Sequence, residues 1–195
     1  MRTTATIIAR SLSILGHPVV VIPVVVATLM LHGGASSAGV AVSVVCAVGL
    51  AVLAFSLWQV RRGRWRHVDA SLRGERRSLN LFLAIILLLG AVFAFVRTPE
   101  VGLSVGLLMS GVLILVVMSA SSWLNVSLHA SFAAFAVALL WPLHYWYVVI
   151  ASVAAAAVCW SRVILGRHSI EEVLVGSLLG AACGTCVWVA LRLHG

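Results

Sequence analysis

Long apolar runs constrain this chain more than any other feature of its sequence. A helix needs about 20 apolar residues to cross a bilayer, and seven segments approach that description among the 195 residues. They lie at approximately 14–32, 38–60, 80–97, 101–120, 128–142, 144–162 and 169–192. The two segments that meet at Pro142 are short, so the number of crossings is six or seven.

Composition supports the same interpretation. Hydrophobic residues make up 63% of the chain and charged residues 9%, whereas soluble domains are nearer half apolar and a quarter charged. A core of this size could not hide so much apolar surface from water. The sequence therefore predicts an all-α, polytopic transmembrane helical bundle that forms a single integral membrane domain over residues 1–195.

The arginines indicate how the chain crosses the membrane. Each pair of crossings returns the chain to the same side, so the polar segments 61–79, 121–128 and 161–168 should share one face. With seven spans, that face carries eleven of the thirteen arginines and the other face carries two, Arg97 and Arg192. The bias predicts a cytoplasmic position for the arginine-rich face. Thirteen arginines without a lysine favour a bacterial protein, and hence the bacterial inner membrane.

A possible chemical site lies between the last two apolar runs. His168 and Glu172 are four residues apart, which places them on one face of a helix. The carboxylate can then accept a hydrogen bond from one imidazole nitrogen, which fixes the tautomer and makes the other nitrogen more nucleophilic. Arg162 and Arg167 are close in sequence, and guanidinium groups suit phosphate oxygens. The alternative is a positively charged loop with a histidine that caps the last helix.

Two further polar clusters would join it on the same face. In the first, Ser127 could cap the following helix, whose free N–H groups could hold an anion, and His129 could protonate a leaving oxygen. Alone, this cluster could equally be a helix cap with an interfacial histidine. The second is the arginine-rich loop 61–77, which otherwise resembles an ordinary cytoplasmic loop. Its candidate residues are Asp69, Glu75, Arg76 and Arg77.

These residues resemble the motifs of the type 2 phosphatidic acid phosphatase family, which includes membrane lipid-phosphate phosphatases and shares its site with vanadium haloperoxidases. The family's third motif reads Ser-Arg, five residues, His, three residues, Asp. Ser161, Arg162 and His168 match it at the same spacing, and Glu172 replaces the aspartate.

The other two motifs of the family are less complete. The second reads Pro-Ser-Gly-His, of which Ser127 and His129 remain. The first reads Lys, six residues, Arg-Pro. Arg76 or Arg77 can stand for its arginine, but Asp69 stands seven residues before Arg76, where the lysine would be. The resemblance covers roughly residues 61–180, which it identifies as a phosphatase-like core.

The resemblance implies a mechanism without a metal or cofactor. His168 would attack phosphorus and form a phosphohistidine, Glu172 would orient it, and His129 would protonate the departing group. The phosphate-binding residues would be Arg162, Ser127, Arg76, Arg77 and Arg167, with Asp69 as a further member of the site. The composition agrees, because five acidic residues in all leave few ligands for a two-metal site.

The expected substrate is an amphiphile with a phosphate head. Polyprenyl phosphates or diphosphates and phosphatidic-acid-like lipids both fit, and lipids are the only partners expected. Nucleic acid is not, because the arginines that give the net charge of +8 lie beside apolar runs.

Three other functions stay open. The chain could be a catalytically silent lipid-binding or scaffold protein, or a lipid phosphotransferase. It could also be a small transporter, although its spans hold almost none of the intramembrane charge expected there. Cys183 and Cys186 have redox-motif spacing, but all four cysteines lie in apolar runs and are expected to be small core residues.

Overall fold

The computed structural model describes residues 4–33, 38–65, 72–97, 101–121 and 123–194. These residues form eight helices, and none of them is in a strand. The helices are α1 (Thr4–Leu15), α2 (Pro18–Gly33), α3 (Ala38–Arg61), α4 (Arg73–Arg97), α5 (Val101–Ala120), α6 (Leu128–Leu140), α7 (Tyr145–Ile164) and α8 (Ile170–His194). Five of them are long and apolar enough to cross a membrane, and a sixth span arises if α1 and α2 are counted as one. The chain is therefore an all-α integral membrane bundle, as expected.

The first expected span, 14–32, is wrong as a single helix. α1 ends at Leu15 and α2 begins at Pro18, with a bend of 54° between them. Proline has no N–H to continue the ladder of helical hydrogen bonds, and Pro18 stands at the first position of α2, where no such bond is needed. His17 caps the beginning of α2, because its Nδ1 accepts the N–H of Val19 at 3.2 Å. The break leaves His17 at the junction of the two helices.

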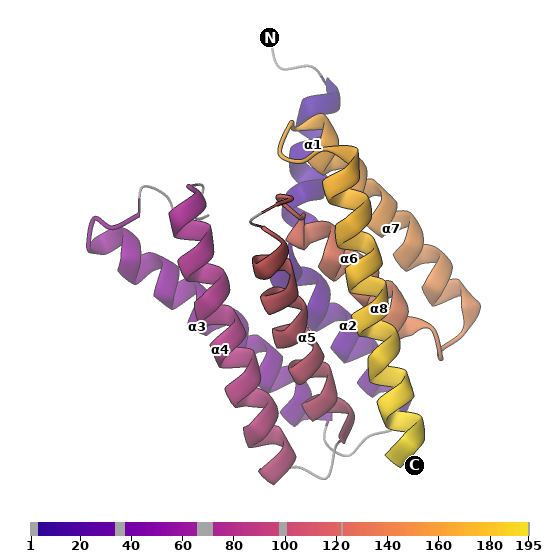
Figure 1. Ribbon diagram of the computed structural model, residues 1–195. Coiled ribbons are helices and arrows are strands. Elements are labelled where there is room, and N and C mark those ends of the chain that lie inside the picture. Colours follow the sequence, from indigo (N-terminus) through magenta and orange to yellow (C-terminus); the bar gives the residue numbers. More distant parts are fainter. Residues whose placement is uncertain (1–3, 34–37, 66–71, 98–100, 122, 195) are drawn as a thin grey trace.

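The expected span 128–142 is also shorter than a crossing. α6 has 13 residues and is about 20 Å long at 1.5 Å per residue, against a hydrocarbon core of about 30 Å. It packs against α2, α7 and α8 in the interior of the bundle (Figure 1). Seven full crossings are therefore not supported.

Close packing of α6 on α8 joins two of the polar segments. Gly176, Gly180 and Gly184 of α8 lie on one face, where the backbone of α6 approaches. A Cβ atom at Gly180 would collide with the backbone carbonyl of Ser131. Small residues at every fourth position allow such contacts between membrane helices. The contact holds the beginning of α6 against the beginning of α8.

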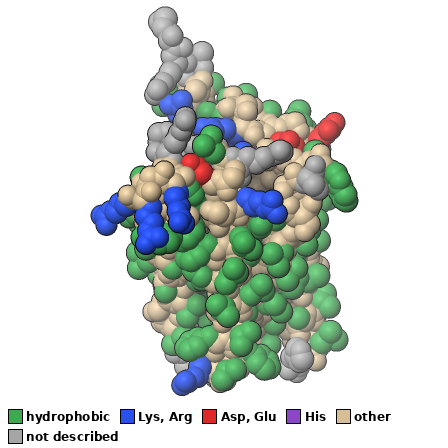
Figure 2. Space-filling model, turned by 60° about the vertical axis from the view of Figure 1, so that its left-hand side comes forward, with side chains coloured by type: hydrophobic (Ala, Val, Ile, Leu, Met, Phe, Trp, Pro, Cys, Tyr) green, Lys and Arg blue, Asp and Glu red, His purple; other side chains and the backbone are tan. Residues whose placement is uncertain are grey.

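Polar segments that are far apart in sequence gather at one end of the bundle. The beginnings of α4, α6 and α8 and the ends of α5 and α7 lie at the upper end in Figure 1. Figure 2 shows basic side chains collected at that end, above a broad hydrophobic band. Pairs of crossings thus place the described parts of the three polar segments together.

The cysteines do not occupy the positions expected of them. All four are free thiols. Cys46 and Cys186 are exposed on the outer surface of the bundle, and Cys159 and Cys183 are half-buried. The prediction that they are small core residues is therefore wrong for the first pair, because outward-facing positions of a membrane helix can also be apolar.

Candidate active site

The turn between α7 and α8 is built by a glycine. Gly166 has φ +61°, a left-handed conformation that side chains with a Cβ atom adopt at a cost. The N–H of Gly166 donates to the carbonyl of Val163 (2.9 Å), and the N–H of Arg167 to that of Arg162 (3.0 Å). This pair of bonds is a Schellman motif, a common helix end. It ends α7 at Ile164, two residues after Arg162, and brings the N–H of His168 to within 3.3 Å of the carbonyl of Arg162.

The beginning of α8 then fixes Glu172. The N–H of Ser169 donates to Oε2 of Glu172 (3.2 Å), and the N–H of Glu172 donates to Oγ of Ser169 (3.2 Å). These reciprocal bonds form a capping box. The same Oε2 atom lies 3.0 Å from Nδ1 of His168. The hydrogen bond expected from the four-residue spacing is therefore present, and the carboxylate that makes it is held by the helix cap.

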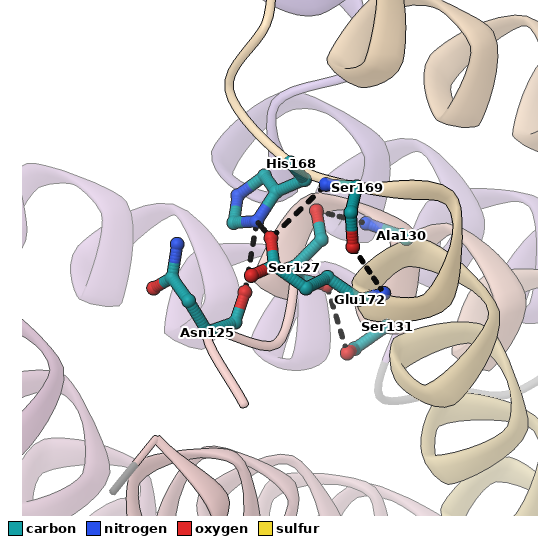
Figure 3. Close-up of polar contacts among 7 residues, drawn as sticks. All are labelled: Asn125, Ser127, Ala130, Ser131, His168, Ser169 and Glu172. Carbon is teal, nitrogen blue, oxygen red and sulfur yellow. Dashed lines mark hydrogen bonds and ion pairs between the residues drawn. The ribbon is translucent and has the colours of Figure 1, made fainter. Parts of the chain in front are cut away.

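His168 is also tied to the segment before α6. Its Nδ1 lies 2.9 Å from the backbone carbonyl oxygen of Asn125, and the N–H of Ser127 donates to the carbonyl of Glu172 at 3.3 Å. Both acceptors of Nδ1 are oxygen atoms without protons, so Nδ1 carries the hydrogen. Figure 3 shows the other ring nitrogen pointing away from Glu172. The neutral ring therefore presents Nε2 with an available lone pair.

Burial favours this neutral form of His168. The side chain is 6% exposed. Burial lowers the pKa of His168 from its usual value of 6.5, the hydrogen bond to Glu172 opposes that change, and the positive charge of Arg162 adds to it. At neutral pH the imidazole is unprotonated, as a nucleophile must be.

His129 lies in the first turn of α6, beside two other histidines. Ser127 caps the helix and accepts the N–H of Ala130 at 3.5 Å, as expected. The ring of His129 meets that of His17 edge-to-face, with centroids 5.0 Å apart. Burial lowers the pKa of His129 to about 2, and the charges of Arg162, His17 and His168 contribute to this. The neutral form of His129 is therefore favoured at neutral pH, and a neighbouring anion would favour the protonated form.

Arg162 lies close to two other arginines, Arg76 and Arg167. Its Nη1 donates to Oγ of Ser13 at 2.7 Å. Its Nε is buried and has no hydrogen-bond partner among the described residues. A buried donor left without an acceptor costs about 1–3 kcal/mol. Arg162 also interacts electrostatically with Arg167 and Arg76, so like charges converge at this end of the bundle and an anion would relieve their repulsion.

The other predicted site residues divide into three groups. Arg76 and Arg167 are exposed and near enough to Arg162 to interact with it. Arg77 is exposed and, in the described part of the chain, takes no part in the hydrogen bonds of the cluster. Asp69 lies outside the described residues.

Four participants were missed by the sequence analysis. Ser13 lies just before the expected apolar span 14–32 and His17 lies within it, and neither belonged to a motif. The backbone carbonyl of Asn125 has no sequence signal. Ser169, by contrast, could have been found, because Ser-Ile-Glu-Glu has the spacing of a capping box.

The fold and the cluster together define a class of protein: an integral membrane helical bundle with a partly buried histidine–arginine cluster at one end, formed by His17, His129, Arg162 and His168. Among the residues that the structure describes, no three His, Cys, Asp or Glu side chains lie together as metal ligands would. No family model, curated protein or solved structure matches the chain.

Proposed function

We propose that this protein is a membrane-embedded lipid phosphatase with a core of the type 2 phosphatidic acid phosphatase kind. The observation that carries the proposal is the state of His168. Its Nδ1 is fixed by Glu172 and the carbonyl of Asn125, and its Nε2 is left as a nucleophile. Arg162, whose buried Nε has no hydrogen-bond partner within the described ranges, is close enough to lower the pKa of His168.

The first half of the reaction makes a phosphohistidine. Nε2 of His168 attacks phosphorus as the bond from phosphorus to the lipid oxygen breaks. His129 gives its proton to the departing oxygen. Glu172 stabilises the positive charge that develops on the imidazole, as a carboxylate on the far nitrogen does in other histidine sites. Arg162 and Arg76 neutralise the phosphoryl oxygens.

The second half regenerates the enzyme. A water molecule attacks phosphorus, its proton passes to His129, and the bond between phosphorus and Nε2 breaks to release inorganic phosphate. The acid role of His129 needs the phosphate to be bound. Burial and the neighbouring positive charges hold the pKa of His129 low. A bound phosphate dianion offsets those charges, so that His129 takes up a proton from solvent when the substrate binds.

The position of the cluster favours a lipid substrate. It lies at one end of a bundle whose sides are broadly apolar (Figure 2), where an amphiphile would present a phosphate head. Polyprenyl phosphates or diphosphates and glycerolipid phosphates are the two candidate classes. We infer that the site faces the cytoplasm at a bacterial inner membrane, because most of the arginines that the structure describes lie at that end.

The test is phosphate release by the purified full chain in detergent micelles, with both lipid classes as substrates. We expect release from at least one class. We also expect a transient, acid-labile phosphoryl group that mass spectrometry of a rapidly quenched reaction locates on residue 168. No release from either class would contradict the proposal, and so would a phosphoryl group on another residue.

A further inference from the structure

Two apolar cavities lie on opposite sides of α2. The first has a volume of about 370 Å³ and is lined by α1, α2, α6 and α7. The second, of about 440 Å³, is lined by α2, α3, α4, α5, α6 and α8. α2 and α6 are in contact and contribute residues to both. These two helices therefore form a wall with a cavity on each side.

Both cavities begin beside the histidine–arginine cluster. Gly16 lines the first and Pro18 the second, and His17 stands between them in the chain. The same division recurs on α6, one turn beyond His129, where Ala133 lines the first cavity and Phe132 the second. The contact between the rings of His17 and His129 thus lies where the two cavities diverge.

The far limits of the cavities also meet. Tyr147 lines the first cavity and His32 lines the second, and the Tyr147 hydroxyl lies 2.7 Å from Nε2 of His32. Along α7 the first cavity extends from Tyr147 to Val158, and along α2 the second extends from Pro18 to His32. At 1.5 Å per residue these lengths are roughly 17 Å and 21 Å. One leaflet of a hydrocarbon core is about 15 Å deep, so each cavity is long enough for one lipid chain of a single leaflet.

We propose that the two cavities hold the two apolar chains of one substrate molecule, a diacyl glycerolipid phosphate, with α2 between the chains and the phosphate at Arg162 and His168. This inference rests on the proposed function and chooses between its two substrate classes. Two chains joined near one head match two apolar cavities that diverge beside one cationic cluster. A single polyprenyl chain would leave one of the two empty.

The test fills one cavity at a time. Ala154→Phe places a ring in the first cavity from α7, where Ala154 is exposed. Gly106→Phe does so in the second from α5, where a Cβ atom at Gly106 meets nothing within 4 Å. Val153→Phe and Leu108→Phe are matched controls on the same helices, because both side chains are exposed and line neither cavity. Substrates are a diacyl, a single-acyl and a short-chain soluble phosphate ester.

We expect each cavity variant to lower kcat/KM for the diacyl substrate by roughly tenfold or more, since excluding several methylene groups forfeits their burial. The single-acyl ester should need both substitutions for a comparable loss, and the soluble ester should be unaffected. The inference is overturned if diacyl and single-acyl substrates respond equally to one substitution, or if the controls behave like the cavity variants.

A second measurement does not depend on turnover. A diacyl phosphate with a photoreactive group in each of its two chains should label both α7 and α5 when bound to the His168→Ala variant. Labelling of only one of these helices would contradict two-chain binding. If the wild-type chain releases phosphate from no lipid, the proposed function fails, and this cross-linking still decides whether the cavities bind lipid chains.

Discussion

The turns at the two ends of α7 each contain a histidine, and their surroundings differ. At one end His144 caps α7, accepting the N–H of Trp146 at 3.5 Å on Nδ1. Its ring lies tilted by 39° to that of Tyr145, with the two centroids 4.4 Å apart. Three large aromatic side chains nearby are more than half exposed: Trp141, Tyr145 and Trp146. Aromatic residues of this kind anchor a bundle at the membrane–water interface.

At the other end His168 faces charged groups. Its ring is buried and bonded to Glu172, and Arg162 is near enough to influence it. His144 uses its Nδ1 to cap the beginning of a helix, whereas the Nδ1 of His168 is fixed by a carboxylate. Both histidines lie in a turn next to α7, so position alone does not identify a candidate catalyst. His168 is one because a carboxylate holds its ring and an arginine lies near it.

Replacing each histidine by alanine should give the largest contrast. His168→Ala removes the proposed nucleophile and should lower kcat for lipid phosphate hydrolysis by roughly 10⁴-fold or more. His144→Ala should leave it within about threefold, since a lost helix cap costs only about 1 kcal/mol of stability. Both are measured as phosphate release by purified protein. An equal loss of kcat in the two variants would contradict a catalytic role that is specific to His168.

A smaller effect is expected when Glu172 loses its charge. Glu172→Gln keeps the shape of the side chain but no longer stabilises a positive imidazole, so kcat should fall by roughly 10²-fold. Glu172 raises the pKa of His168, so the substitution should lower that pKa further. Attack requires the neutral ring, hence the acid limb of the kcat/KM profile should move to lower pH. A limb that stays in place or moves to higher pH would argue against His168 as the titrating group.

The smallest expected effect concerns the glycine of the second turn. Gly166→Ala puts a Cβ atom on a residue at φ +61°, which costs about 1 kcal/mol. For a chain of this size the midpoint of thermal unfolding in detergent should fall by roughly 2–4 °C. Gly39→Ala is the matched control, because that helical glycine has open space around its α-carbon. A control that loses as much stability as Gly166→Ala would show that the left-handed turn is not what matters.

The sequence determined most of the fold and the local parts of the site. Long apolar runs require helices in a bilayer, since lipid leaves backbone groups no other partners. The His168–Glu172 bond followed from helical periodicity, and the cap at Ser127 from local hydrogen bonding, because both involve residues within one turn. The same local reasoning failed at residues 14–32, where apolar character alone could not reveal the break before Pro18.

Only the tertiary structure decided what else faces these residues. Ser13 lies far from Arg162 in the chain and His17 far from His129, and no periodicity connects either pair. The contacts within these two pairs depend on the angle between α1 and α2. They also depend on the glycine face of α8, which allows α8 to pack closely on α6. Contacts of this kind are set by side-chain packing across the whole bundle, whereas the pattern of a sequence reports chiefly on neighbours along one helix.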